Sequence, residues 1–317
     1  MTEASHTSEP SRSEQPGRGP ISVVLPTVDG VEACREIAAL LEPADELVVV
    51  CDAADDPIAT AAGLPAAARI VTAGAPVACS GKANAVAAGI EAAAHDRIVL
   101  TDDDFSRPDD WLRQLSADYE RDGPSSELPL FVGCDPLSRL FEPLYAVGSL
   151  GLYYTDIAWG GAIIFDRADL DVDRVCAELR RTVSDDGLLS EHLDITQRRR
   201  LRTVPIGGTL SESIERHVRF VQIFRWFAPG GLAAAIVGFT ALAVVCLLVP
   251  AVAGLVIASA VVVYATLGTW RVAVLWTPAS VLSFPPAVVY ALSRRTFVWA
   301  GRRYRWRGKF DTVVESE

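Results

Sequence analysis

The chain has 317 residues, half of them apolar, and carries a formal net charge of −11 at pH 7. This length suffices for one sizeable soluble domain and a membrane part. The acid excess argues against a nucleic-acid partner, because surfaces that bind nucleic acid are basic. The only lysines are Lys82 and Lys309, a bias typical either of a halophile-like acidic surface or of a GC-rich genome.

The six cysteines form no Cys-x-x-Cys pair and no zinc-like spacing with histidine. We therefore expect free thiols in a reducing compartment. Residues 1–20 are rich in Ser, Glu, Pro and Gly and contain no apolar core of a signal peptide. We expect a disordered tail there and a catalytic part that stays in the cytoplasm.

Short β-rich runs alternate with helical patterns from residue 21 onward. The runs cover 21–26, 46–52, 69–72 and 97–102, and helical spacing covers 31–41 and 84–94. This alternation predicts an α/β fold with a mostly parallel sheet flanked by helices. Ligands of such sheets bind beyond the carboxyl ends of the strands.

Carboxylates follow two of these runs. Asp52 ends the second, and Asp102-Asp103-Asp104 ends the fourth. Asp-x-Asp on a loop offers the oxygen ligands that Mg²⁺ or Mn²⁺ prefers, and these metals bridge to phosphates. The alternative is a solvated acidic turn. Lys82 opens a helix, where a lysine beside the helix N-terminus suits an anion, although simple capping by its neighbours is the alternative.

Two segments between residues 159 and 186 carry further candidates. Trp159-Gly160-Gly161 places an aromatic face beside an open backbone, which suits a sugar or an acceptor and equally suits a core tryptophan at a strand bulge. Asp185-Asp186 precedes a short helical segment. One acid of this pair either faces a site or caps the helix.

An aromatic and basic segment precedes the first long apolar stretch. Residues 216–227 have the composition of an interfacial helix and contain Gln222, Arg225 and Trp226 as Gln-x-x-Arg-Trp. Anchoring at a membrane edge explains the arginine and the tryptophan but not a glutamine at this spacing.

Three apolar stretches follow, at 230–249, 251–268 and 271–292. Because about twenty apolar residues cross a bilayer, the first two predict a hairpin of two spans. The third contains three prolines, so we expect a re-entrant segment, with three spans as the alternative. The basic residues from Arg294 to Lys309 favour a cytoplasmic end.

The order of these motifs resembles the inverting, processive-type glycosyltransferase family two, which has the GT-A fold, and within it the ceramide glucosyltransferase-like membrane enzymes. Their pattern is an Asp after the second strand, an Asp-x-Asp, a later acid and Gln-x-x-Arg-Trp before C-terminal membrane segments. Residues 296–304 also resemble a Trp-x-Gly-Arg-x-Tyr element of such enzymes. The likeness covers roughly residues 21–310. The chain departs from it in having no N-terminal membrane helix and in having Asp185 where Glu is usual.

The resemblance implies roles for the aspartates and the Gln-x-x-Arg-Trp residues, and their own residue patterns suggest the roles of Lys82 and the Trp-Gly-Gly segment. The divalent metal, Mg²⁺ or Mn²⁺, falls to Asp104 with Asp102, and the general base is Asp186. Nucleotide-sugar binding falls to Asp52, Lys82, Asp102 and Asp103. Contact with the acceptor or the diphosphate falls to Trp159, Gly160, Gly161, Gln222, Arg225 and Trp226.

The expected layout is a disordered tail (1–20), a GT-A glycosyltransferase domain (21–212), an interfacial helix (213–228), a transmembrane region of two to three spans (229–293) and a basic cytoplasmic tail (294–317). We expect a multi-pass protein of the cell membrane that moves a sugar from a nucleotide-sugar donor to a membrane lipid. Two alternatives stay open, a polyprenyl (dolichyl) phosphate sugar synthase and a non-catalytic nucleotide-sugar-binding membrane scaffold.

Overall fold

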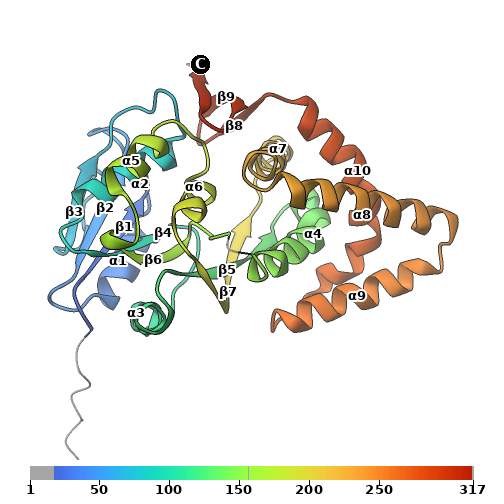
Figure 1. Ribbon diagram of the computed structural model, residues 1–317, viewed down its shortest axis with the longest axis horizontal. Coiled ribbons are helices and arrows are strands. Elements are labelled where there is room, and N and C mark those ends of the chain that lie inside the picture. Colours follow the sequence, from blue (N-terminus) through green and yellow to red (C-terminus); the bar gives the residue numbers. More distant parts are fainter. Residues whose placement is uncertain (1–17, 156, 316–317) are drawn as a thin grey trace, which may run out of the picture.

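The computed structural model describes residues 18–155 and 157–315, and its largest unit is a seven-stranded sheet (Figure 1). The strand order is β3-β2-β1-β4-β6-β5-β7. Neighbours among β1 to β4 are parallel, β6 runs antiparallel to β4 and β5, and β7 is parallel to β5. The strands are β1 (Ile21–Pro26), β2 (Glu46–Cys51), β3 (Ala68–Thr72), β4 (Arg97–Thr101), β5 (Ser125–Gly133), β6 (Ala162–Asp166) and β7 (Thr196–Ile206). The predicted mostly parallel α/β sheet is confirmed.

Helices cover both faces of this sheet, which explains why its central strands are apolar throughout. One buried cluster joins the sheet to α2 (Gly81–Ala92), α5 (Val172–Leu179) and α6 (Asp185–His192). A second joins the opposite face to α1 (Val31–Leu40) and α3 (Trp111–Asp122). A short 3₁₀ turn, η1 (Arg167–Asp169), follows β6.

The start of α2 lies three residues before the predicted start at Asn84. Ser80 caps the helix, accepting a hydrogen bond from the Ala83 N–H at 3.0 Å. Its hydroxyl also donates to the Val183 carbonyl at 2.7 Å, and its N–H donates to the Thr182 carbonyl at 3.0 Å. These bonds join the beginning of α2 to the loop before α6 and so fix the distance between the two helix starts.

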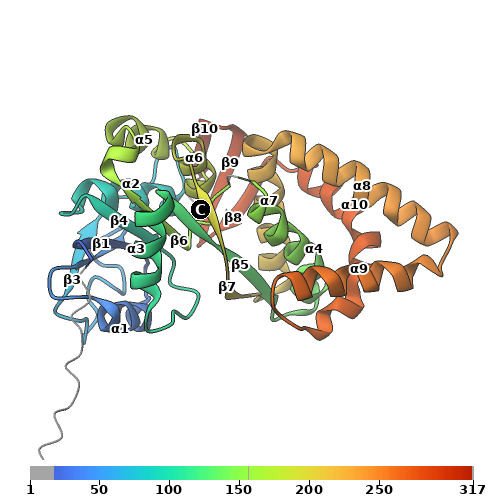
Figure 2. The same cartoon turned by 60° about the horizontal axis from the view of Figure 1, so that its bottom comes forward.

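Helices α7 to α10 form the second part of the molecule, at the right of Figure 2. They are α7 (Leu210–Phe227), α8 (Pro229–Leu248), α9 (Val252–Thr266) and α10 (Thr277–Ser293), with a 3₁₀ turn η2 (Val272–Trp276) before α10. By length and composition, 229–248 and 272–293 are long and apolar enough to cross a membrane. The helix expected over 251–268 has only 15 residues, because Gly268 ends the segment with a positive φ of 78°. At ~1.5 Å per residue it spans about 22 Å, less than a bilayer core.

A buried carboxylate joins this helical part to the α/β part. Glu142, on α4 (Pro136–Tyr153), is fully buried and forms an ion pair with Arg271, just before η2. The same carboxylate accepts a hydrogen bond from the Gly133 N–H at 3.0 Å, and the Tyr264 hydroxyl lies 3.5 Å from it. The chain leaving α9 is therefore fixed against the end of β5 and the body of α4.

Both ends of α10 are tied to other helices, the beginning to α4 and the end to α7. Near its beginning, the Ser280 hydroxyl donates to the Leu140 carbonyl of α4. Near its end, the side-chain amide of Gln222 on α7 donates to the carbonyls of Ala291 and Arg294, each at 2.9 Å. A helix held at both ends in this way lies across α4 and α7.

The basic C-terminal segment, to which we assigned no element, forms a three-stranded antiparallel sheet. Its strands are β8 (Thr296–Trp299), β9 (Arg302–Gly308) and β10 (Asp311–Glu315), in the order β10-β9-β8. Phe297, Tyr304 and Trp306 are buried against α7 and α10. At the other end of the chain, residues 1–17 of the expected disordered tail lie outside the described residues, whereas Arg18 is paired with Asp45.

Candidate active site

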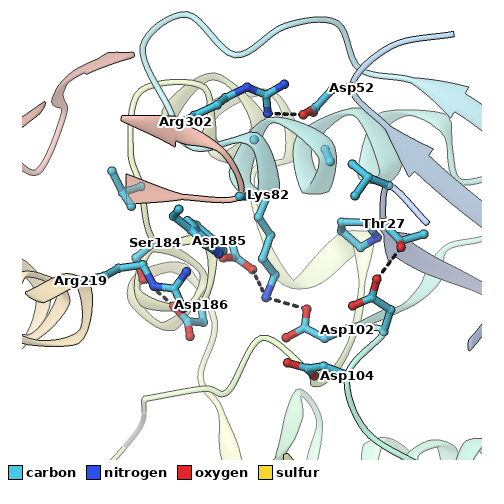
Figure 3. Close-up of a pocket in the computed structure, with 18 of the residues that line it drawn as sticks. Thr27, Asp52, Lys82, Asp102, Asp104, Ser184, Asp185, Asp186, Arg219 and Arg302 are labelled. Carbon is cyan, nitrogen blue, oxygen red and sulfur yellow. Dashed lines mark hydrogen bonds and ion pairs between the residues drawn. The ribbon is translucent and has the colours of Figure 1, made fainter. Parts of the chain in front are cut away.

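A cavity of about 580 Å³ lies at the carboxyl ends of β1, β2 and β4. Its walls come from the loops after these strands, the first turns of α2 and α6, one face of α7 and the C-terminal sheet (Figure 3). Of the sequence-predicted site residues, it brings together Asp52, Lys82, Asp102, Asp103, Asp104, Trp159 and Asp186. The placement beyond the strand ends follows from the topology of the sheet.

Lys82 holds the centre of the cavity. Its Nζ lies 2.6 Å from Asp102 Oδ1 and 3.4 Å from Asp185 Oδ2. Burial lowers the pKa of a lysine, but the attraction of Asp102, Asp185 and Asp186 outweighs it, and the pKa of Lys82 is raised above its ordinary value. Lys82 is therefore a permanent cation that bridges the β4 loop and the start of α6.

The three aspartates after β4 point in different directions. The Asp103 carboxylate accepts a hydrogen bond from the Thr27 hydroxyl, which ties the loop to the end of β1. Asp104 faces the open cavity, where reduced hydration and the nearby charge of Asp102 raise its pKa to about 7, against the opposing effect of Lys82. The site thus holds more negative charge than Lys82 balances.

Asp102 and Asp104 suit a divalent metal shared with a ligand. No group of three or more His, Cys, Asp or Glu side chains with metal-binding geometry occurs within residues 18–155 and 157–315. Mg²⁺ is usually held by one or two carboxylates, with water and substrate phosphates completing its octahedron. Two carboxylates and excess negative charge fit that arrangement, so these two residues remain the predicted metal ligands.

Asp185 and Asp186 begin α6 with different surroundings. Asp185 is buried, and burial raises its pKa to about 6 although Lys82 opposes the shift. Asp186 is less buried; its Oδ1 accepts from the Ser184 hydroxyl at 2.5 Å and from the Gly187 N–H at 2.8 Å. Both aspartates line the cavity but in different ways, with Asp185 toward Lys82 and Asp186 beside Ser184 and Arg219 (Figure 3).

The Trp-Gly-Gly segment packs tightly under this cluster. The Trp159 ring is nearly buried, with its centroid 5.0 Å from that of Phe105, so it serves the core while one edge lines the cavity. A Cβ at Gly160 would lie 2.9 Å from Asp185 Oδ2 and 3.0 Å from Lys82 Nζ. A Cβ at Gly161 would collide with the Trp159 ring. Glycine is thus required at both positions, because the neighbouring side chains leave no room for a Cβ atom.

The C-terminal sheet closes the other end of the cavity. Arg302 on β9 forms an ion pair with Asp52, and the Tyr304 hydroxyl accepts a hydrogen bond from the Gly81 N–H at 3.3 Å. Trp299 lines the same wall. We assigned no site role to these three residues from the sequence. All three belong to the Trp-x-Gly-Arg-x-Tyr element, which is the sequence signal that could have identified them.

The Gln-x-x-Arg-Trp residues lie outside the set that lines the cavity. Gln222 is buried and binds the end of α10, Arg225 is exposed, and the Trp226 ring lies 6.5 Å from that of Trp306. The residues of α7 that do line the cavity are Arg219, Phe220 and Ile223. Contact of Gln222, Arg225 and Trp226 with an acceptor stays a prediction.

No family model matches the sequence, and no curated protein matches it significantly. Among solved structures, the chain is similar to glucosyl-3-phosphoglycerate synthase from Mycobacterium tuberculosis in complex with Mn²⁺ and uridine-diphosphate-glucose. The identity is 20% and the TM-score 0.41, over 65% of this chain and 79% of that one. The same enzyme in complex with phosphoglyceric acid gives 21% and 0.40, over 65% and 80%. These overlaps are partial, and the proposals below rest on the geometry of the cavity.

Gly160→Ala should disrupt the site while sparing the fold. The added methyl group meets the mobile ends of Lys82 and Asp185 rather than backbone, so these side chains must separate. We expect loss of nucleoside diphosphate binding, measured by calorimetry, with little change in melting temperature. Gly148→Ala on α4 is the matched control, because its methyl group meets nothing within 4 Å. Unchanged binding by the Gly160 variant would show that the Lys82 cluster is not the ligand site.

Proposed function

We propose that this protein is a metal-dependent inverting glycosyltransferase that moves a sugar from a nucleotide-sugar donor to a membrane lipid. The observation that carries the proposal is the meeting of Asp102, Asp104, Lys82 and Asp186 in one cavity at the carboxyl edge of the sheet. Two carboxylates for a metal, a fixed cation and a separate carboxylate are the groups that diphosphate departure and acceptor activation require.

The donor is proposed to lie with its nucleoside near Asp52 and its diphosphate near Asp102 and Asp104. A bound Mg²⁺ or Mn²⁺ would neutralise charge on the departing diphosphate. Lys82 orients Asp102 and adds positive charge beside the same position. These residues therefore bind and orient the donor and stabilise its leaving group.

Asp186 is proposed as the general base. Its Oδ1 is fixed by Ser184 and Gly187, which holds the carboxylate at the cavity wall. A hydroxyl oxygen of the acceptor attacks the anomeric carbon while its proton passes to Asp186, and the bond from that carbon to the diphosphate oxygen breaks. One such in-line displacement inverts the anomeric configuration.

The membrane part supports a lipid acceptor. Helices α8 to α10 expose large apolar side chains, among them Val237, Leu247, Leu255, Val262 and Val289, in amounts that a monomer in water rarely tolerates. We propose that α8 and α9 enter the bilayer as a hairpin whose turn lies at the far surface, with the shorter α9 ending before the near surface. We propose that α10, held at both ends by α4 and α7, lies at the interface.

The two alternatives differ in testable ways. A polyprenyl-phosphate sugar synthase would form a mild-acid-labile phospholipid sugar, whereas a glycolipid product is stable to mild acid. A scaffold would bind the nucleotide sugar without consuming it. Donor hydrolysis by the purified protein, followed by product analysis with radiolabelled donor, separates all three.

The metal proposal predicts that Asp104→Asn removes most transfer activity, because the variant loses a metal ligand next to the diphosphate. EDTA should abolish activity of the parent protein, and Mg²⁺ or Mn²⁺ should restore it. Activity is measured with radiolabelled nucleotide sugar and a lipid extract. Asp110→Asn, outside the cavity-lining set, serves as the control. Transfer that survives both Asp104→Asn and EDTA would remove the metal from the mechanism.

The base proposal predicts a selective loss for Asp186→Asn. General base catalysis typically contributes about 10²–10⁴ in rate, so transfer should fall by that factor with near-normal donor affinity. Asp185→Asn should reduce transfer less. A capping role instead predicts lower stability from either change and no selective catalytic loss. Transfer rate, donor affinity and melting temperature of both variants decide between the two, and a parental rate for Asp186→Asn rejects the mechanism.

The membrane proposal predicts that the C-terminal sheet and the turn between α8 and α9 lie on opposite sides. In a Cys134→Ser background, Asp311→Cys should react with an impermeant maleimide only from the cytoplasmic side of sealed vesicles. Ala251→Cys, in the turn, should react from the outside or remain protected by lipid. Both positions are exposed, and Cys134 is the only exposed cysteine among the described residues. Labelling of position 311 from outside would reject this topology.

A further inference from the structure

Three cationic side chains line the cavity, and two of them are neutralised. Lys82 is paired with Asp102 and Asp185, and Arg302 is paired with Asp52. The third, Arg219, has no carboxylate within 4.0 Å among residues 18–155 and 157–315. Its charge is therefore available to a ligand.

Cation–π contacts with two aromatic rings fix the position of the Arg219 guanidinium and leave its N–H groups without a carboxylate partner. The guanidinium carbon lies 3.9 Å from the centre of the Trp299 ring and 5.5 Å from that of Phe220. Burial, together with the nearby charge of Arg216, lowers the pKa of Arg219 to about 10, so it remains a cation at neutral pH. Because a partly buried charge without a carboxylate partner is poorly compensated, this arrangement favours an anionic ligand.

Arg219 lies on the acceptor side of the cavity. Figure 3 shows it next to Asp186, whereas the Asp52–Arg302 pair lies beyond Lys82 on the other side. Its helix continues towards α8, and the neighbouring Phe220 and Ile223 give the cavity an apolar edge. A lipid that approaches along α7 would bring its head group to Arg219 and the proposed base together.

We propose that the acceptor is a phospholipid whose head group carries a free hydroxyl, and that Arg219 binds the head-group phosphate beside Asp186. This rests on the proposed glycosyltransferase function. The planar guanidinium matches phosphate oxygens with two parallel hydrogen bonds.

The presence of a base distinguishes two kinds of phosphate-bearing lipid. A hydroxyl must lose its proton to Asp186 as its oxygen bonds to the anomeric carbon and the nucleoside diphosphate leaves with the bonding electrons. A terminal lipid phosphate is already ionised and needs no base. The acceptor phosphate is bound by Arg219 and remains unchanged in the product.

The test compares three acceptors in mixed micelles, with the nucleotide sugar that the full-length protein hydrolyses fastest. Phosphatidylglycerol has a phosphate and hydroxyls, diacylglycerol has a hydroxyl alone, and undecaprenyl phosphate has a phosphate alone. We expect transfer to phosphatidylglycerol in clear preference to the other two.

Substitutions of Arg219 test whether this residue is responsible for the preference. Arg219→Gln should raise the KM for phosphatidylglycerol about 10- to 100-fold, the range expected for charged hydrogen bonds. Arg219→Lys, which keeps the charge and guards against misfolding, should fall between Gln and the parent. Affinity for the nucleoside diphosphate should be unchanged in both. Arg216→Gln on the same helix is the matched control, because Arg216 is outside the cavity-lining set and should leave the KM unchanged.

Three results would overturn this inference. They are equal transfer to diacylglycerol, transfer to undecaprenyl phosphate alone, and weaker nucleoside diphosphate binding by Arg219→Gln with an unchanged acceptor KM. Each of them leaves the glycosyltransferase function intact. Absence of donor hydrolysis and transfer with every nucleotide sugar would reject that function as well.

Discussion

The bridge from Lys82 to Asp102 and Asp185 is the constraint on which the cavity depends. It joins the end of β4 to the start of α6, and Ser80 fixes the lysine's own helix to the loop that leads into α6. One ammonium cannot balance the carboxylates of Asp102, Asp104, Asp185 and Asp186. The pKa of Asp104 is raised first by burial and then by the nearby charge of Asp102. These carboxylates would repel an anionic diphosphate. A divalent cation held by Asp102 and Asp104, as proposed, would offset this repulsion, so binding of the metal and of the diphosphate should be strongly coupled.

The cavity is complete only when the chain has passed through its apolar helices. Asp52 and Arg302 are 250 positions apart in sequence, and the segment between them includes α8, α9 and α10. Glu142 fixes the chain that leaves α9, and Gln222 fixes the end of α10 before β8 begins. These contacts determine where the C-terminal sheet lies against α7 and the start of α2. The position of helices α8 to α10 therefore helps to determine the shape of the cavity, and a domain cut before α8 would lack one wall of the cavity.

The pattern of apolar residues was sufficient to predict strands where a short apolar run was the dominant signal. The strands β1 to β4 are short apolar runs followed by turns or carboxylates, and their topology brings Asp52 and Asp102 to one edge of the sheet. It was insufficient for β7, because a run of arginines does not look like a strand. The arginines are tolerated there because Asp118, Asp122 and Glu127, from distant segments, balance their charges. It was also insufficient for the C-terminal sheet. A basic composition there indicated a tail, whereas the alternate burial of Tyr304 and Trp306 depends on α7, which no local pattern reveals.

The rotation of α7 about its own axis explains why the cavity-lining residues of this helix are not those of the Gln-x-x-Arg-Trp motif. At about 100° per residue, Arg219, Phe220 and Ile223 fall within one arc of the helix, and Arg225 points well away from it. Trp226 shares the face of Arg219 but lies two turns further on, against Trp306. Gln222 binds the last carbonyls of α10. In this structure Gln222 and Trp226 of the Gln-x-x-Arg-Trp motif set the rotation and depth of α7 relative to α10 and β9. That setting places Arg219, one to two turns earlier on the helix, against Trp299 and beside Asp186.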